Sequence, residues 1–211
     1  MNSDSGHRSV YQKKAVFFDG QVNEPWAARE YGEQEMKNLD MMFAMSGPFE
    51  NMKILEPGCG TGRLTRILSD KAGQAGSVAA LDISPAMVDA ARKRLGDREN
   101  VRVLCTGIED FKCRCHSFDI IICHQVFPHF ENKHEILKLM HEILRHEGRV
   151  IIHHFIGLRE INDVHRKAGT IIQNDLMPDS VGMRTLFAET GFKVIFIQDN
   201  ENGYFLKAVR P

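Results

Sequence analysis

Net charge is almost absent from this chain of 211 residues, in which 27 lysines and arginines face 28 aspartates and glutamates. Such a balance offers no basic surface for a phosphate backbone, so no nucleic acid is expected as a partner. No apolar run approaches the roughly 20 residues of a membrane span, and the segment Met1–Asp4 lacks the charged and then apolar order of a signal peptide. These absences predict a cytoplasmic protein that does not bind membranes.

Cysteines are also few, and their odd number in a chain without a secretion signal favours reduced thiols over disulfides. The five are Cys59, Cys105, Cys113, Cys115 and Cys123. The Cys-Arg-Cys-His segment at 113–116 suggests a metal site at first sight, but it lacks a second pair of ligands at zinc spacing. No bound metal is therefore predicted.

Short apolar stretches alternate with helical patterns from residue 53 onward, which is typical of a parallel sheet covered by helices. Strands are expected at 53–56, 77–81, 101–105, 118–123 and 149–153, and two more, at 192–198 and 204–209, flank a hairpin-like connection. The pattern predicts an α/β fold: a Rossmann-like three-layer α/β/α sandwich with a mostly parallel seven-stranded sheet and a C-terminal antiparallel hairpin.

The first 50 residues follow a different pattern. Residues 1 to about 14 are polar and are expected to lack regular structure. A helix is expected from about Trp26 to Ala44, after the helix-start signal Asn23-Glu24-Pro25. We therefore divide the chain into an N-terminal extension (1–50) and a main domain (51–211), which together form one globular unit.

Three glycines at alternate positions, Gly58, Gly60 and Gly62, separate the first expected strand from a helix. Because one side of this turn has no side chains, a ligand can lie against the backbone, and the following helix directs free amide groups to the same place. A dinucleotide-binding turn of the form G-x-G-x-x-G would need its third glycine at position 63, which is Arg63. The turn thus indicates a nucleotide-type ligand but departs from the dinucleotide pattern.

With Glu56 two residues before the first glycine and Asp82 at the end of the second strand, this region resembles class I S-adenosylmethionine-dependent methyltransferases, in particular the group called type 11. The strand at 118–123 and the segment Val126–His129 also resemble later motifs of this family. The resemblance implies S-adenosyl-L-methionine as the cofactor. It also implies a lid over the site, formed by the N-terminal helix with Phe17–Asp19 and Trp26.

By this resemblance, Glu56 meets the ammonium group of the methionyl end and Asp82 accepts both ribose hydroxyls; the competing interpretation is that each carboxylate only caps a turn or helix. Gly107 stands where the family usually has an acid that binds adenine. Either Glu109 or Asp110 replaces that acid, or the backbone alone holds the base. The residues expected to bind the cofactor are Glu56, Gly58, Cys59, Gly60, Asp82, Ile83, Met87, Gly107, Ile108, Glu109, His124 and Gln125.

Histidine is suited to remove a proton from an acceptor at neutral pH. Histidines fall in segments that can face the carboxyl edge of the sheet, namely His124, His129, His153, His154 and His165. Because side chains alternate along a strand, His153 and His154 should point to opposite faces. His154 is the preferred catalytic candidate and His129 the second; the alternatives are that these histidines are structural or that they bind a metal.

The sequence therefore predicts an S-adenosylmethionine-dependent methyltransferase of the EC 2.1.1 class that acts on a small-molecule acceptor. One alternative is methylation of RNA or protein, and another is a non-catalytic, cofactor-binding regulatory protein on the same fold. The acceptor is not identified, and the oligomeric state is left open, with a homodimer as one alternative. The segment 160–167 is a candidate wall of the acceptor pocket or, equally, a solvated helix.

Overall fold

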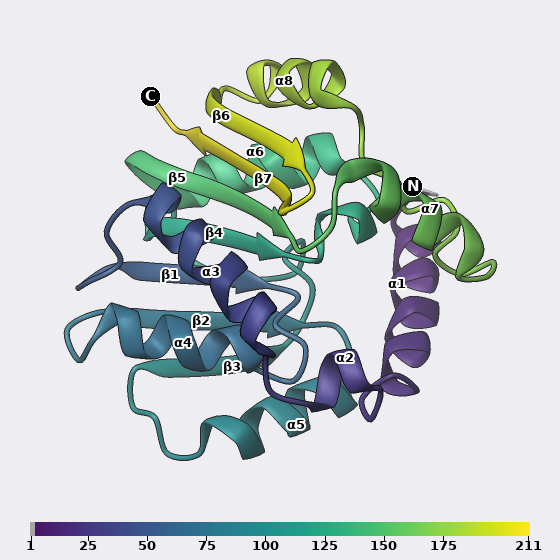
Figure 1. Ribbon diagram of the computed structural model, residues 1–211, viewed down its shortest axis with the longest axis horizontal. Coiled ribbons are helices and arrows are strands. Elements are labelled where there is room, and N and C mark those ends of the chain that lie inside the picture. The colour runs from purple at the N-terminus through teal and green to yellow at the C-terminus, as the bar shows by residue number, and fades with distance from the viewer. Residues whose placement is uncertain (1–2) are drawn as a thin grey trace.

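The computed structural model describes the backbone of residues 3–211 and the side chains from residue 10 onward. Its centre is a seven-stranded sheet with the order β3-β2-β1-β4-β5-β7-β6 (Figure 1). The first five strands are mutually parallel, whereas β7 runs antiparallel to both β5 and β6, which confirms the predicted fold. The strands are β1 (Lys53–Pro57), β2 (Ser77–Asp82), β3 (Val101–Cys105), β4 (Phe118–His124), β5 (Leu144–His154), β6 (Lys193–Asn200) and β7 (Gly203–Val209).

Helices cover both faces of the sheet, and the alternation of apolar side chains along the strands explains why. In β4, Ile120 and Ile122 join the core on one face, while Ile121 and Cys123 join the core on the other. Figure 1 shows α3 and α4 in front of the sheet. The first face is covered by α3 (Glu33–Ser46), α4 (Arg63–Ala72) and α5 (Pro85–Leu95), and the second by α6 (Lys133–Ile143) and α8 (Ser180–Glu189).

Helix α1 (Ser3–Asp19) and helix α7 (Leu158–Lys167) lie beyond the carboxyl ends of the parallel strands (Figure 1). The expectation that residues 1 to about 14 lack regular structure is wrong for residues 3–14, and residues 1 and 2 lie outside the described part. Tyr11, Lys14 and Phe18 recur at helical spacing and all face the sheet edge, so the helix forms by burying one stripe.

The expected helix from Trp26 to Ala44 is two helices, α2 (Pro25–Ala28) and α3. Arg29 has an extended backbone, and Gly32 starts α3, its amide donating a hydrogen bond to the Glu35 carboxylate over 2.7 Å. The break lets Tyr31 turn inward, where its ring lies 3.7 Å from the guanidinium carbon of Arg63. The glycine and the glutamate three residues later are a helix-start signal within the predicted helix.

Within residues 3–211, no helix combines the length and the apolar character needed to cross a membrane.

Candidate functional site

A cavity of about 400 Å³ opens at the carboxyl edge of the sheet, between the glycine turn, α1 and α7. Parallel α/β sheets bind ligands at this edge, where the strand order reverses next to β1. Nine of the twelve residues predicted to bind the cofactor line it: Gly58, Gly60, Asp82, Ile83, Met87, Gly107, Ile108, Glu109 and Gln125. The other three, Glu56, Cys59 and His124, are buried outside the lining, and their ligand contacts stay predictions.

The first two glycines of the turn serve different purposes. Gly58 has φ +71°, and a Cβ placed on it would lie 2.3 Å from Cγ2 of Val126, so the close packing of β1 against the β4 loop requires glycine. Gly60 has φ +53°, and a Cβ placed on it would meet nothing within 4 Å. Its bare backbone therefore faces open space in the cavity, as a ligand cradle requires.

Asp82 ends β2 beside this turn, and its carboxylate is already engaged by backbone amides. Its two oxygens accept hydrogen bonds from the amides of Gly60 and Ser84 over 2.8 and 2.9 Å. Burial raises the pKa of Asp82, and these backbone donors act against that shift. A carboxylate has about four lone-pair sites, so the two amide bonds leave room for two further donors.

Glu56 ends β1 below the turn, where its carboxylate accepts a hydrogen bond from the Thr65 hydroxyl over 2.6 Å. Its side chain is buried and does not line the cavity. Burial raises the pKa of Glu56 to about 8, with the charge of Asp82 adding to the shift, although the Thr65 bond opposes it. Glu56 is thus largely protonated at neutral pH and becomes a stronger acid when a cation approaches.

The far end of the cavity is formed by the loops after β2 and β3. Ile83, Met87 and Ile108 provide apolar walls there, next to the backbone of Gly107. Of the two acids considered as substitutes at this end, Glu109 lines the cavity and Asp110 does not. Glu109 accepts a hydrogen bond from the Tyr11 hydroxyl of α1.

Helix α1 is attached to this end of the cavity by Asp19 as well. Its carboxylate accepts hydrogen bonds from the Ser84 hydroxyl over 2.5 Å and from the Ala86 amide over 3.0 Å, at the start of α5. Phe17 and Trp26, which were expected in a lid segment, line the cavity.

His124 and His153 form a buried pair next to, but outside, the cavity lining. Their Nδ1 atoms lie 2.9 Å apart, so one nitrogen donates to the other. Burial lowers the pKa of both rings, that of His153 to about 4. Gln125, which follows directly, lines the cavity with φ +55°, a costly conformation for a residue other than glycine.

In β5, the side chain of His154 lies on the same face of the sheet as those of Val150 and Ile152. It therefore lies on the opposite face from His153, as predicted. Its Nε2 is buried without a hydrogen-bond partner, and burial lowers its pKa well below the ordinary value. The ring does not line the cavity. A catalytic role for His154 stays a prediction.

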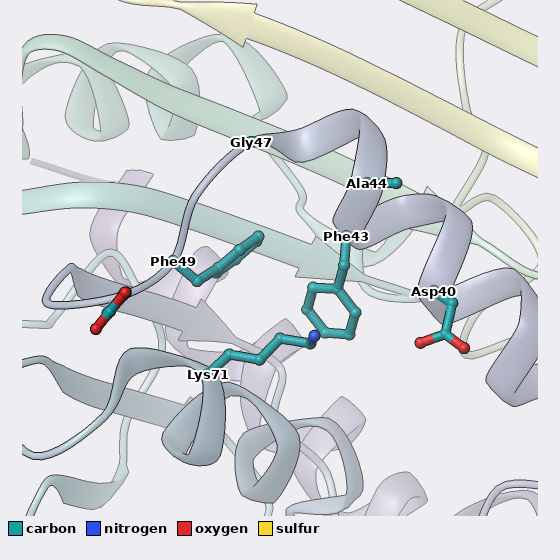
Figure 2. A pocket seen from close by; sticks show the side chains of 7 residues that line it. Asp40, Phe43, Ala44, Gly47, Phe49 and Lys71 are labelled. Atoms are coloured by element: carbon teal, nitrogen blue, oxygen red, sulfur yellow. The ribbon is translucent and has the colours of Figure 1, made fainter.

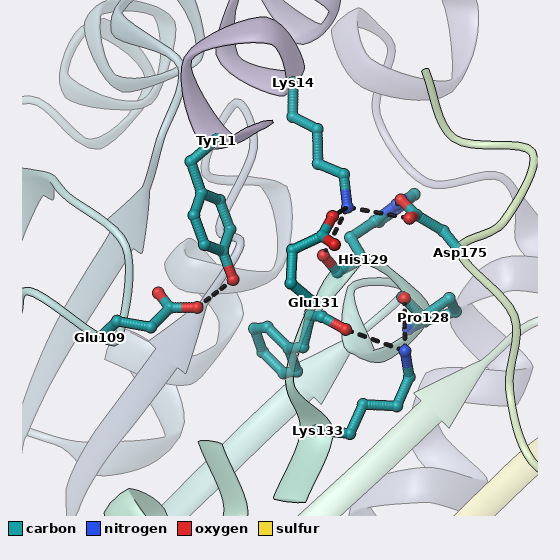
Figure 3. A network of polar contacts seen from close by, with 9 residues as sticks. Tyr11, Lys14, Glu109, Pro128, His129, Glu131, Lys133 and Asp175 are labelled. Atoms are coloured by element: carbon teal, nitrogen blue, oxygen red, sulfur yellow. Dashed lines mark hydrogen bonds and ion pairs between the residues drawn. The ribbon is translucent and has the colours of Figure 1, made fainter. Parts of the chain in front are cut away.

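His129, the second catalytic candidate, lines the cavity and belongs to a polar network with α1 (Figure 3). Its Nδ1 lies 2.7 Å from Oδ2 of Asp175, and Lys14 donates to the other oxygen of Asp175 over 2.8 Å. Lys14 also pairs with Glu131. Sequence reasoning missed Lys14 and Asp175, because they are 161 positions apart and each stands in a segment without a motif.

No group of three or more His, Cys, Asp or Glu residues that could hold a metal ion occurs in the described part of the chain. A second hollow, of about 410 Å³, lies between α3 and the end of α4, away from the glycine turn (Figure 2). There the Lys71 ammonium lies 4.3 Å from the centre of the Phe43 ring, so its charge already has a partner. This hollow offers no group to the chemistry at the carboxyl edge.

Comparisons with known proteins agree with this geometry. Residues 48–196 match a family model described as a methyltransferase domain. The chain is 31% identical over 106 residues to the malonyl-[acyl-carrier protein] O-methyltransferase of Priestia megaterium, covering 50% of this chain and 38% of that protein. It is 27% identical over 183 residues to the ubiquinone/menaquinone biosynthesis C-methyltransferase UbiE of Idiomarina loihiensis, covering 75% and 73% respectively.

Among solved structures, the chain is similar to a SAM-dependent methyltransferase from Aquifex aeolicus. The TM-score is 0.69 at 18% identity, with 92% of this chain and 97% of that chain covered. At this identity the likeness shows a shared fold. The match to the Priestia megaterium protein spans well under half of its length, so what its name says of a substrate describes that protein.

Proposed function

The chain belongs to the methyltransferase-domain family, with the fold of class I S-adenosylmethionine-dependent enzymes, and on that premise we propose that it methylates a small molecule. One observation carries the proposal. The cavity brings the bare backbone of Gly60, the carboxylate of Asp82 and the apolar wall after β2 and β3 together at one sheet edge.

These residues fit S-adenosylmethionine along its length. Asp82 keeps lone pairs for the ribose hydroxyls after serving two backbone amides, and Ile83, Met87 and Ile108 would enclose the adenine. Gly60 allows the methionyl end to approach the backbone. Glu56 would lose its proton as the ammonium group approaches. Its carboxylate would then bind that group through water or after a small shift of the turn.

The bound cofactor would supply an activated methyl group on a sulfonium. The protein would then have two tasks, which are to place an acceptor in line with that methyl group and to exclude water. Helix α1 suits the second task because Tyr11, Phe17 and Phe18 lie over the cavity. Hydrogen bonds that Asp19 accepts and Tyr11 donates hold the helix to the cofactor side.

The size and the charge of the cavity support a small acceptor over RNA or protein. Its volume of about 400 Å³ is within the range of small-molecule sites. Among the described residues that line it, the single lysine is Lys14, and carboxylates already neutralise this lysine. The names of the two relatives include an O- and a C-methyltransferase, so relatedness leaves the attacking atom open.

Isothermal titration calorimetry tests the cofactor assignment directly. We expect saturable binding of S-adenosylmethionine and of S-adenosylhomocysteine, with NAD as the comparison ligand. Binding of NAD without binding of either sulfur compound would refute the proposal. Tight cofactor binding without transfer to any acceptor in a broad screen would favour the regulatory alternative.

A further inference from the structure

The ring of His129 is held in one orientation by Asp175. Burial alone would raise the pKa of Asp175, but the hydrogen bonds from His129 and Lys14 outweigh it and hold this pKa below its usual range. The carboxylate is therefore ionised at neutral pH and acts only as an acceptor, so the proton of a neutral His129 lies on Nδ1. Nε2 keeps its lone pair, and this ring lines the cavity.

Lys14 binds the other oxygen of the Asp175 carboxylate. Its ammonium has three protons, and these reach Oδ1 of Asp175 over 2.8 Å, the carbonyl oxygen of His129 over 2.9 Å and the Glu131 carboxylate. The Lys14 side chain is only 1% exposed. With Oδ1 occupied in this way, Oδ2 of Asp175 is the oxygen left for the imidazole (Figure 3).

A second histidine borders the same space. The His165 ring lies 4.9 Å from the His129 ring, lines the cavity and is 8% exposed. Its Nδ1 is buried without a hydrogen-bond partner. Burial, with the nearby His129, lowers the pKa of His165 to about 4, so this ring stays neutral at physiological pH.

Charged and titratable groups approach His129 from every element packed around it. They are Lys14 from α1, Glu131 from the loop before α6, Lys133 from α6, His154 from β5, His165 from α7, and Asp175 from the segment before α8. Lys133 donates to the carbonyl oxygens of Pro128 and Phe130 over 2.9 Å and so braces the loop that carries His129. Among the described residues, the two cations Lys14 and Lys133 balance the two carboxylates Glu131 and Asp175.

Apart from Gln21 and Gln125, the rest of the described wall on this side is apolar. Phe17 and Phe18 come from α1, Phe130 from the loop after β4, Val164 from α7 and Ile172 from the segment that follows. Among the described residues of the lining, the only lysine is already paired, so these residues offer no free cation to a carboxylate or phosphate on the acceptor. The wall favours an uncharged, largely apolar molecule.

We propose that His129, positioned by Asp175, removes the proton from a weakly acidic hydroxyl or thiol of a small, uncharged, largely apolar acceptor. The inference rests on the proposed methyl transfer. The acceptor proton passes to Nε2 of His129, and the electron pair of the oxygen or sulfur forms the bond to the methyl carbon. The pair of the old carbon–sulfur bond remains on the departing sulfur, which becomes a neutral thioether. The imidazolium is balanced by Asp175 and then loses its proton to solvent.

Substitution of Asp175 by Asn tests the positioning role through the ring tautomer. Lys14 would keep the amide oxygen of D175N, so the amide NH₂ would face Nδ1 of His129 and force the ring proton onto Nε2. Nitrogen-15 NMR of the cofactor-free protein should show Nε2 of His129 unprotonated in the wild type and protonated in D175N. The role of Asp175 would be overturned if the neutral His129 ring of the wild type carried its proton on Nε2. It would also be overturned if D175N had the same tautomer as the wild type.

Lys14→Met is the matched control, because it loosens α1 but leaves the Asp175 carboxylate on Nδ1. We expect its tautomer to be that of the wild type, and a flipped tautomer would count against the role given to the carboxylate. For D175N, kcat/KM should fall by roughly 10²- to 10³-fold, while calorimetry shows S-adenosylmethionine binding close to wild type. If D175N does not fold, the proposal is tested by the tautomer of His129 in the wild type and by the pH–rate profile of His129→Gln.

The pH profile identifies the base itself. A general base works only in its unprotonated form, so the wild-type rate should fall at low pH, and His129→Gln should lose this limb along with most of its kcat. An H129Q enzyme with the wild-type profile and turnover would overturn the proposal. If the wild type does not bind S-adenosylmethionine at all, the proposed function itself is wrong.

A matched panel tests the acceptor class: 4-propylphenol, 4-propylthiophenol and 4-propylbenzoate. We expect methylation of the phenol, the thiol or both, with the product distinguishing the oxygen acceptor from the sulfur acceptor. Methylation of the benzoate alone, or transfer to neither the phenol nor the thiol by an enzyme that binds the cofactor, would overturn the acceptor class.

Discussion

The ammonium of Lys14 and the carboxylate of Asp175 lie 2.8 Å apart, although 161 positions separate these residues in the chain. Lys14 is on α1, and Asp175 is in the irregular segment between α7 and α8. Both side chains are buried, at 1% and 9% exposure. This pair attaches the N-terminal helix over the cavity to the segment that orients His129.

Lys14→Met should therefore release α1 from the rest of the domain. Removing one partner of a buried ion pair leaves the other charge uncompensated, at a cost of roughly 3 kcal/mol. Exchange of the α1 backbone amides with deuterium should accelerate by about 100-fold. The exposed neighbour Lys13 provides the control, because Lys13→Met should leave the exchange rates unchanged. Equal protection of α1 in both variants would contradict the anchoring role of Lys14.

Asp82→Asn should weaken S-adenosylmethionine binding while leaving the fold intact. The amide oxygen can still accept one backbone hydrogen bond, but the charge-assisted bonds to the ribose hydroxyls are lost. Bonds to a charged group contribute about 1.5–3 kcal/mol, so the dissociation constant measured by calorimetry should rise roughly 10- to 150-fold. Asp89→Asn, on the exposed side of α5, is the matched control. Equal affinity in the two variants would remove Asp82 from the ribose role.

Much of the fold and the cofactor side of the site could be predicted from the sequence because their signals are local. The turn from Glu56 to Gly62 is contiguous, and Asp82 stands directly at the end of an apolar strand. The break at Gly32 was missed, although a glutamate three residues later marks a helix start, because the apolar spacing continues across it.

The contacts around His129 and the buried histidine pair could not be predicted in the same way because they join distant segments. Asp175 has no motif around it, and its role depends on where α1 docks. The pairing of His124 with His153 depends on the register of β4 against β5, in which these two residues are partners. Sequence patterns define which strands exist more readily than how they align.

Glu56→Gln should change how the stability of the protein depends on pH. The folded-state pKa of Glu56 is about 8, above its ordinary value of 4.5, so the folded protein keeps a proton that the unfolded chain loses. Between these values the free energy of unfolding of the wild type should fall with rising pH, by up to about 1.4 kcal/mol per pH unit. A neutral glutamine keeps an acceptor for Thr65 and removes this slope.

The measurement is urea unfolding of both proteins from pH 5 to pH 9. The stability advantage of E56Q should grow with pH and level off near pH 8. Glu33→Gln, at an exposed position of α3, serves as the control and should follow the wild type. A constant difference between E56Q and the wild type across this range would show that Glu56 is ionised in the folded protein.

Alanine substitutions at the first two glycines of the turn should separate packing from ligand binding. Gly58→Ala places a Cβ 2.3 Å from Cγ2 of Val126 at φ +71°, so overpacking and backbone strain add up to about 2–5 kcal/mol. Gly60→Ala meets no atom within 4 Å and carries the backbone strain alone, roughly 1–2 kcal/mol. The G60A protein should therefore fold, yet bind S-adenosylmethionine more weakly, because its new methyl group occupies the cradle.

A double-mutant cycle with Val126→Gly identifies the cause at Gly58. Removal of the Val126 side chain eliminates the close contact but leaves the strain at φ +71°, so the two substitutions should show a favourable coupling energy in urea unfolding. The same V126G change combined with G60A should show none, since no Val126 atom lies within 4 Å of that Cβ position. Additive effects at Gly58 would mean that strain, rather than contact with the β4 loop, requires the glycine. An unchanged cofactor affinity in G60A would mean that the ligand does not lie against this part of the turn.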